Sequence, residues 1–172
     1  MESELRREQI LNMVMSQTSP ISASALAKTL KVSRQVIVGD VALLRAKGHE
    51  IVATARGYII PKAREFNSYL GKIACRHTRE DTKSELYVMV DLDATVVNVI
   101  VEHDLYGEIA GGLNLTDRKD VDIFIEKAEL SKVRLLSELT MEVHLHTIAC
   151  RDKIHFEQIC KALKDKGYLF EN

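Results

Sequence analysis

The sequence predicts an α+β fold in two modules, at residues 1–62 and 69–172, with a linker at 63–68. In the first module, three segments with helical spacing of apolar residues precede a short β-prone pair. In the second, the order is β-α-β-β-α-β with an αβ tail, which packs as an α/β sandwich with helices on one face of a sheet. Charge divides the chain at the same place, because residues 1–62 carry a net charge of +4 and the rest of the chain carries −5. We therefore expect a basic module that meets an anion and an acidic module that does not.

The first module opens with three helices, expected at residues 4–17, 22–30 and 33–47. Ser22 and Ser33 stand at the start of the second and third helical patterns, where a serine hydroxyl caps free backbone N–H groups. The apolar residues expected to face the core are Leu5, Ile10, Leu11, Val14, Met15, Leu26, Ala27, Leu30, Val36, Ile37, Val41 and Leu44.

Two short β-prone runs follow the third helix, at residues 50–54 and 57–60. The order helix, helix, turn, helix, hairpin is typical of a winged helix-turn-helix, whose third helix enters the DNA major groove, about 12 Å wide. Arginine and glutamine make paired hydrogen bonds to base edges, and neighbouring arginines contact phosphates. The residues expected to contact DNA are Ser33, Arg34, Gln35 and Arg45 on the third helix, with Arg6 and Arg56 beside it.

The second module alternates between strand-like and helical patterns over about 105 residues, which is enough chain for a modest core. The expected strands are at residues 72–78, 94–102, 105–115, 139–149 and 168–170, and the expected helices are at 80–90, 117–130 and 152–166.

Composition excludes several protein classes. The chain has 172 residues, of which 46% are hydrophobic and 28% charged, with 8 Gly and 2 Pro, so it is neither disordered nor collagen-like. No apolar run approaches the ~18–20 residues of a membrane span, and the first 20 residues are charged and amphipathic. We therefore expect a cytoplasmic protein without a signal peptide. Three cysteines make an odd number, which favours free thiols over disulfides.

The strand expected at residues 139–149 carries His144 and His146 on one face. Val143 and Leu145 lie on the opposite face, which is expected to pack in the hydrophobic core. Residues two apart on a strand have Cα atoms about 6.5–7 Å apart, so the two imidazoles can bind one metal ion. Taken alone, the pattern also fits two polar surface histidines.

Two further ligands are available near that face. His77 ends the first strand of the module, and Glu85 lies on the helix that follows. Three imidazoles and one carboxylate suit Zn²⁺, Ni²⁺, Fe²⁺ or Mn²⁺. From the residues alone, His77 also fits a capping or exposed histidine, and a solvated helix residue is the favoured interpretation of Glu85. Cys75 and Cys150 also lie near this face by strand parity, where small buried hydrophobes are favoured over thiolate ligands. His155, in the last helix, is expected at the surface.

A specific resemblance emerges at residues 33–48, SRQVIVGDVALLRAKG, followed by IVATARGY at residues 51–58. These segments resemble the DNA-binding module of the niacin-responsive repressors of NAD biosynthesis, the NiaR family, which couples this module to a 3H domain named for its histidines. Gly39 departs from the family pattern, where a longer polar residue is usual, and this departure bears on the operator sequence.

The second module resembles the 3H domain itself, through His77 with Glu85, residues 101–109 (VEHDLYGEI) and residues 143–148 (VHLHTI). The resemblance implies one divalent transition metal per subunit. Asp104 and Glu142 depart from the family pattern, which has proline and a small residue at those positions. The resemblance implies His77, Glu85, His144 and His146 as metal ligands and His103, Tyr106 and Gly107 near the effector region.

Three functions follow as hypotheses. The resemblance implies a homodimeric repressor that binds double-stranded operator DNA of NAD biosynthesis or niacin uptake genes, with nicotinic acid or a related pyridine carboxylate as co-repressor. In a metal-sensing regulator, the ion itself is the signal and the same four ligands serve. An enzyme is disfavoured, because no residue pairing suggests a nucleophile and base and Gly111-Gly112 is a weak phosphate-loop signal.

Overall fold

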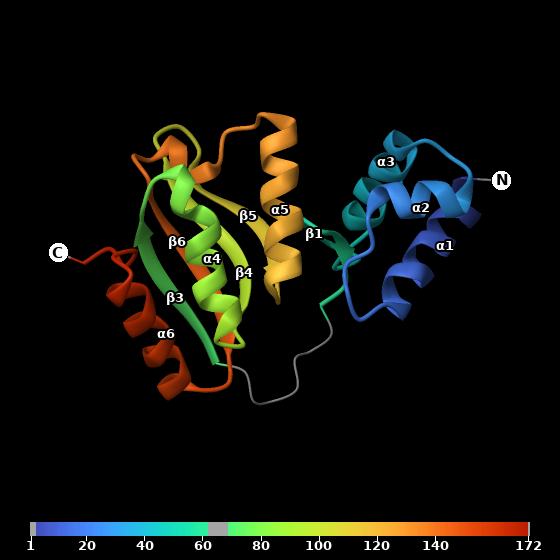
Figure 1. Cartoon of the computed structure of the whole chain (residues 1–172). Helices are drawn as coiled ribbons and strands as arrows, with labels where there is room; N and C mark the ends of the chain where they lie inside the picture. Colours follow the sequence, from blue (N-terminus) through green and yellow to red (C-terminus); the bar gives the residue numbers. More distant parts are fainter. Residues whose placement is uncertain (1–2, 62–68, 172) are drawn as a thin grey trace. The chain divides into compact units, whose positions relative to one another are not determined.

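The computed structural model describes residues 3–61 and 69–171 and divides the chain into two compact units, Met1–Arg64 and Glu65–Asn172 (Figure 1). The linker expected at 63–68 lies outside the described residues. No described helix is both long and apolar enough to span a membrane. The α+β fold class predicted from the sequence is confirmed by the helical first unit and the sheet-containing second one.

The first unit contains three helices, as predicted: α1 (Ser3–Ser16), α2 (Ala23–Leu30) and α3 (Arg34–Ala46). Ser22 and Ser33 cap α2 and α3, since their hydroxyls accept hydrogen bonds from the N–H groups of Ala25 (3.1 Å) and Val36 (3.3 Å). These caps fix where the two helices of the helix-turn-helix begin.

The hairpin consists of β1 (Val52–Thr54) and β2 (Gly57–Ile59), paired antiparallel. Tyr58 also exchanges two backbone hydrogen bonds with Ile21, the residue just before the α2 cap, at 2.8 and 2.9 Å. The hairpin is thereby joined to the helices, which completes the winged arrangement.

The first unit packs around residues from all three helices and from the segment before β1. Burial of each large aliphatic side chain stabilises such a core by about 1.5–3 kcal/mol. The core differs from the prediction at Leu5, Met15 and Val36, whose exposed fractions are 51%, 55% and 37%. Among the described residues of this unit, the buried Val, Leu and Ile side chains are Ile10, Val14, Leu26, Leu30, Ile37, Val41, Leu44 and Ile51.

The second unit has the predicted order of elements from the first strand to the last helix, with two short 3-10 helices added. The strand expected at residues 168–170 is wrong, because this segment forms only an isolated bridge between Leu169 and Cys75. Its elements are β3 (Tyr69–Arg76), η1 (Arg79–Asp81), α4 (Thr82–Asp91), β4 (Thr95–His103), β5 (Gly107–Leu115), α5 (Arg118–Ser131), η2 (Leu136–Leu139), β6 (Val143–Cys150) and α6 (Lys153–Asp165).

The four strands form one antiparallel sheet in the order β3-β6-β4-β5, with α4, α5 and α6 on one side (Figure 1). Strand β6 is thus inserted between β3 and β4, and its residues are covered on both edges. The end of the chain returns to the free edge of β3, where Leu169 forms a bridge to Cys75. The histidine-bearing strand therefore lies inside the sheet, under α4.

The strand expected to begin at residue 139 begins at Val143. Residues 136–139 form η2, and Met141 and Glu142 both have positive φ angles, 50° and 70°, which end the 3-10 turn and redirect the chain. The side-chain alternation along β6 also differs from the prediction. The face of His144 and His146 is the buried one, while Val143 and Leu145 are only half-buried.

Helix α6 corrects a further expectation. His155, expected at the surface, is buried and satisfied on both sides of its ring. Its Nδ1 accepts a hydrogen bond from the N–H of Arg151 (3.2 Å), and its Nε2–H donates to the carbonyl of Leu92 (2.5 Å). His155 is a structural link between α6 and the end of α4.

Candidate metal centre and nucleic-acid interface

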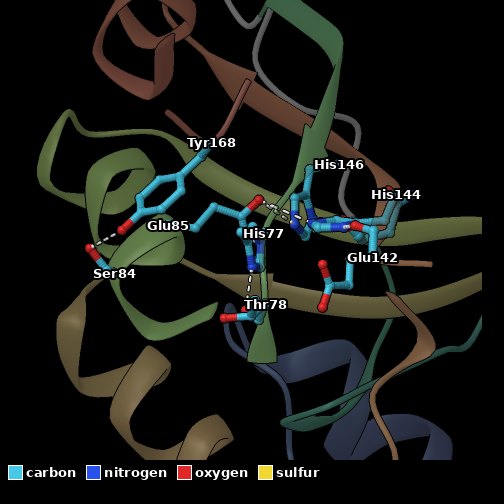
Figure 2. A network of polar contacts seen from close by, with 9 residues as sticks. His77, Thr78, Ser84, Glu85, Glu142, His144, His146 and Tyr168 are labelled. Carbon is cyan, nitrogen blue, oxygen red and sulfur yellow. Dashed lines mark hydrogen bonds and ion pairs between the residues drawn. The ribbon is translucent and has the colours of Figure 1, made fainter. Parts of the chain in front are cut away.

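Four side chains from three elements converge beneath α4 (Figure 2). His77 follows β3, Glu85 lies on the inner face of α4, and His144 and His146 project from β6. The strand register explains the convergence, because Cys75 on β3 pairs directly with His144 on β6. His77 lies two residues after Cys75 and therefore on the same face of the sheet. The sequence-predicted set of His77, Glu85, His144 and His146 is thus brought together.

Each imidazole is oriented by a backbone carbonyl. Nδ1 of His77 lies 2.7 Å from the carbonyl oxygen of Thr78, Nδ1 of His144 lies 2.8 Å from that of Glu142, and Nδ1 of His146 lies 2.8 Å from that of Asn98. A carbonyl oxygen only accepts, so each Nδ1 carries the proton and donates it. The three Nε2 atoms are therefore left for another partner, as in histidines that ligate metals.

All three Nε2 atoms face the carboxylate of Glu85. The distances are 2.8 Å from His77 to Oε2, 3.1 Å from His144 to Oε1 and 3.4 Å from His146 to Oε1. In a neutral imidazole with its proton on Nδ1, Nε2 presents a lone pair, and a carboxylate oxygen presents another. This arrangement is favourable only if protons or a cation lie between them.

The site is closed to solvent. Glu85 is 0% exposed, and the three histidines are 3–8% exposed. Burial opposes ionisation of Glu85, but His146 and the other two imidazoles outweigh it and hold the pKa of its carboxyl well below the usual range. Burial likewise opposes protonation of His77 and His146, but their contact with Glu85 raises both pKa values. A single buried anion thus attracts positive charge into the site.

Three buried atoms of the candidate site form no well-aligned hydrogen bond among the described residues: Nε2 of His77, Nε2 of His146 and Oε2 of Glu85, although the first and last of these lie 2.8 Å apart. Buried polar atoms of this kind are rare in folded proteins and call for a partner such as an ion. The chemistry of this donor set fits a divalent transition metal.

Cys75 extends the site beyond the predicted four residues. Its sulfur, a carboxylate oxygen of Glu85 and a ring nitrogen of His144 lie within 4.8 Å of one another. Burial and then the neighbouring Glu85 carboxylate raise the pKa of the Cys75 thiol. Strand parity was the signal that placed Cys75 near this face in the sequence.

The first unit presents a surface suited to DNA. Arg34, Gln35 and Arg45 are exposed on α3. Ser33 is exposed as well, although its hydroxyl is engaged in capping the helix. The N-terminal end of α3, where the first two of these side chains lie, is the part of a recognition helix that contacts base edges.

The two units match known protein families. Residues 6–59 match a helix-turn-helix domain, and residues 71–172 match the 3H domain. The chain is 39% identical over 169 residues to "Transcription repressor NadR" of Bacillus subtilis, covering 97% of this chain and 94% of that protein. It is 40% identical over 166 residues to "Probable transcription repressor NiaR" of Thermotoga maritima, covering 96% and 94%.

The chain belongs to the NiaR family of repressors of NAD biosynthesis.

Not every residue expected to contact DNA in this NiaR-family chain has a free side chain. Nε of Arg6 lies 2.5 Å from Oδ2 of Asp40, which is itself 4% exposed, and Arg7 lies 3.5 Å from the same carboxylate. Arg6 therefore ties α1 to α3, and the expectation of a phosphate contact overlooked this pairing because Asp40 is 34 residues away. Arg56 lies in the β1–β2 turn, half-buried and engaged in an interaction of its own.

The effector residues implied by the NiaR resemblance lie on the β4–β5 hairpin. Nδ1 of His103 accepts hydrogen bonds from the N–H groups of Leu105 (3.2 Å) and Tyr106 (3.4 Å), and Gly107 has a positive φ of 69°. Tyr106 is 73% exposed. His103 thus shapes the turn, and the hairpin presents an aromatic ring to solvent.

The positions that depart from the NiaR pattern have clear structural settings. Asp104 is exposed in the same turn. Glu142 lies just before β6, where its backbone carbonyl orients His144. Gly39 is exposed on α3, with nothing within 4 Å of where a Cβ would stand.

Proposed function

We propose that this chain is a homodimeric, DNA-binding transcriptional repressor that acts in the cytoplasm on operators of NAD biosynthesis or niacin uptake genes. Nicotinic acid, or a related pyridine carboxylate, is its co-repressor. One divalent transition metal per subunit, Ni²⁺, Zn²⁺, Fe²⁺ or Mn²⁺, is held by His77, Glu85, His144 and His146. It is a regulator and not an enzyme.

The observation that carries the metal part of the proposal is the convergence of three Nε2 atoms on one buried carboxylate. Each imidazole is fixed by a carbonyl at Nδ1, so no ring turns away to find another partner. Two of the three Nε2 atoms are buried and form no well-aligned hydrogen bond among the residues described. A bound cation supplies the positive charge that one carboxylate and three imidazole lone pairs need. It also polarises the carboxylate of any molecule that binds to it.

The DNA part rests on α3. Its capped N-terminal end and the exposed Arg34 and Gln35 suit base contacts in the major groove. A homodimer places two such helices on half-sites about 34 Å apart, one turn of DNA. An effector that favours this arrangement by 1–3 kcal/mol tightens operator binding about 5- to 150-fold.

The co-repressor part rests on the family. A pyridine carboxylate offers a ring that stacks on an aromatic side chain and a carboxylate that binds a cation. His103, Tyr106 and Gly107 on the β4–β5 hairpin are the proposed effector residues, with the exposed ring of Tyr106 as the stacking surface. Replacing Tyr106 with Ala weakens nicotinate binding if this placement is right.

A second function, in which the metal itself is the signal, is favoured by one observation. The four ligands are almost fully buried and number four, as in closed structural sites, whereas sites that bind a further molecule keep a position open. In such a metalloregulator the ion alone changes DNA affinity.

Isothermal titration calorimetry distinguishes the nicotinate-responsive repressor from the metal-sensing regulator. Metal-loaded protein is titrated with nicotinate, nicotinamide and quinolinate, and operator binding is followed by gel shift with and without each compound. Heat on adding nicotinate and tighter operator binding are expected. A change in operator binding on adding metal alone, with no response to any pyridine, replaces the nicotinate model with the metal-sensing one.

A further inference from the structure

We propose that Cys75 is an additional ligand of the metal site, and that its sulfur biases the site toward ions that accept thiolate, such as Zn²⁺ and Co²⁺, over Mn²⁺. This inference rests on the proposed metal centre and specifies which ions it prefers.

The position of Cys75 follows from the sheet. Cys75 stands directly opposite His144 in the β3–β6 pairing, so the two side chains project from the same face. Leu169 pairs with Cys75 on the other edge of β3, which holds the backbone from both sides. Cys75 is 0% exposed. The thiol is therefore fixed beside the imidazole of His144 instead of sampling other positions.

Donor geometry links Cys75 to the site. Its sulfur lies within 4.8 Å of a ring nitrogen of His144 and of a Glu85 oxygen, a spacing that an ion between them brings together by small side-chain movements. A second observation marks the candidate site as one that binds a ligand: Oε2 of Glu85 and Nε2 of His77 are buried, and although they lie 2.8 Å apart, neither forms a well-aligned hydrogen bond within the described part of the chain.

Sulfur strengthens the preference of the site for certain ions. Thiolates favour soft or borderline ions, whereas carboxylate oxygens suit Mn²⁺. A set of three imidazoles and one carboxylate already binds Zn²⁺ more tightly than Mn²⁺, and a sulfur donor widens this difference. The thiol releases its proton to solvent as the metal–sulfur bond forms.

Cobalt absorption tests the proposal directly. The full-length protein is loaded with Co²⁺, whose visible bands report any ordered site and whose near-ultraviolet charge-transfer band appears only with thiolate ligation. The parent protein is expected to show both. Cys75→Ala is expected to keep the visible bands and lose the charge-transfer band.

Cys150→Ala is the matched control, because Cys150 is also a buried cysteine and lies outside the group formed by Cys75, Glu85 and His144. It is expected to keep both bands. Visible bands without a charge-transfer band in the parent overturn the role of Cys75 while leaving the metal centre intact. Absence of all cobalt bands overturns the metal centre itself, and the role of Cys75 with it.

Metal competition provides the second measurement. Cys75→Ser is expected to weaken Zn²⁺ binding by about ten-fold or more while changing Mn²⁺ binding only slightly. Equal losses for the two ions contradict the proposal. Circular dichroism confirms that each variant is folded, and if neither Cys75 variant folds, the spectrum of the cobalt-loaded parent decides the question alone.

Discussion

Arg6 and Arg34 show that two arginines in one DNA-binding unit have separate tasks. Arg6 is bound to the buried Asp40, whereas Arg34 is exposed at the start of α3. Arg34→Ala is expected to weaken operator binding by roughly 1–3 kcal/mol and to relax base preference, with no change in melting temperature. Arg6→Ala is expected to lower the melting temperature, because Asp40 then stays buried without its main partner.

Gel-shift titration and thermal unfolding of both variants check this pair. Unchanged operator affinity in Arg34→Ala contradicts the docking of α3. If Arg6→Ala melts like the parent and binds every DNA sequence more weakly, the result supports the predicted contact of Arg6 with a phosphate.

The pKa values in the metal site give its pH dependence. The raised pKa of His146 means that the pairing of protonated His146 with Glu85 stabilises the metal-free protein below the unfolded value of 6.5, and that this stabilisation is lost as pH rises through the folded pKa. The lowered pKa of Glu85 means that its ionised carboxylate stabilises the folded protein above the unfolded pKa of 4.5. This stabilisation is lost as the pH falls through the folded pKa. The pairing is therefore complete between these two unfolded values.

Metal and protons compete for the same nitrogens, so the increase in melting temperature on adding Zn²⁺ is expected to grow from pH 6 to pH 8 (roughly the range over which imidazoles lose their protons). Thermal unfolding with Zn²⁺ and with a chelator at each pH measures it. An increase that is the same at every pH shows that the ion binds elsewhere.

Among single residues, the sequence predicted which side chains converge at the candidate metal site better than it predicted their surroundings. The two-residue spacing of His144 and His146 indicates a shared face on any strand. His77 and Glu85 depended on the resemblance, because no local pattern shows that a strand end and a helix will meet. Strand parity placed Cys75 near the histidine face, but its position directly opposite His144 depends on the pairing of β3 with β6, a long-range choice that local periodicity does not encode.

At the scale of elements, replacing Gly39 or Gly57 with alanine is expected to have opposite effects on stability. Gly39 lies within α3 in open space, so Gly39→Ala is expected to stabilise the protein by about 0.5–1 kcal/mol through helix propensity. Gly57 has φ +135°, and a Cβ there would lie 2.3 Å from the carbonyl oxygen of Ile21, so Gly57→Ala is expected to destabilise it. Chemical denaturation measures both. A destabilising Gly39→Ala shows that this helix needs the flexibility of glycine.

The starts of helices were predicted well where a capping side chain marks them. The start of β6 was predicted poorly, because residues with unusual backbone angles precede it. Ser22, Ser33 and Asp152 each accept a backbone hydrogen bond at a predicted helix start. The start of β6 was missed because Met141 and Glu142 adopt positive φ angles, which non-glycine residues rarely do and sequence patterns do not reveal. The buried face of β6 was misassigned because His144 and His146 are buried through their contacts with Glu85 on α4, which local hydrophobic periodicity does not reveal.

At the scale of the whole molecule, the proposed function requires that two separate units act together. The residues proposed to contact DNA lie in Met1–Arg64, and the proposed metal ligands lie in Glu65–Asn172. A ligand changes DNA affinity only by binding two states of the protein unequally. The proposed metal centre is the candidate source of that difference, because its four candidate ligands bring the end of β3, α4 and β6 together around Glu85.

Removing one ligand tests this coupling. His146→Ala is expected to lower metal affinity about 10- to 100-fold or more, since the loss of even an indirect partner of a metal ligand has an effect of this size. Without nicotinate, operator affinity is expected to stay within a few-fold of the parent value, because α3 and its exposed side chains are untouched. Nicotinate is then expected to tighten operator binding of the parent but not of His146→Ala in parallel gel shifts. A variant that still responds to nicotinate shows that the effector pocket forms without the metal. A parent protein that responds to added metal in the absence of nicotinate shows instead that the ion is the signal.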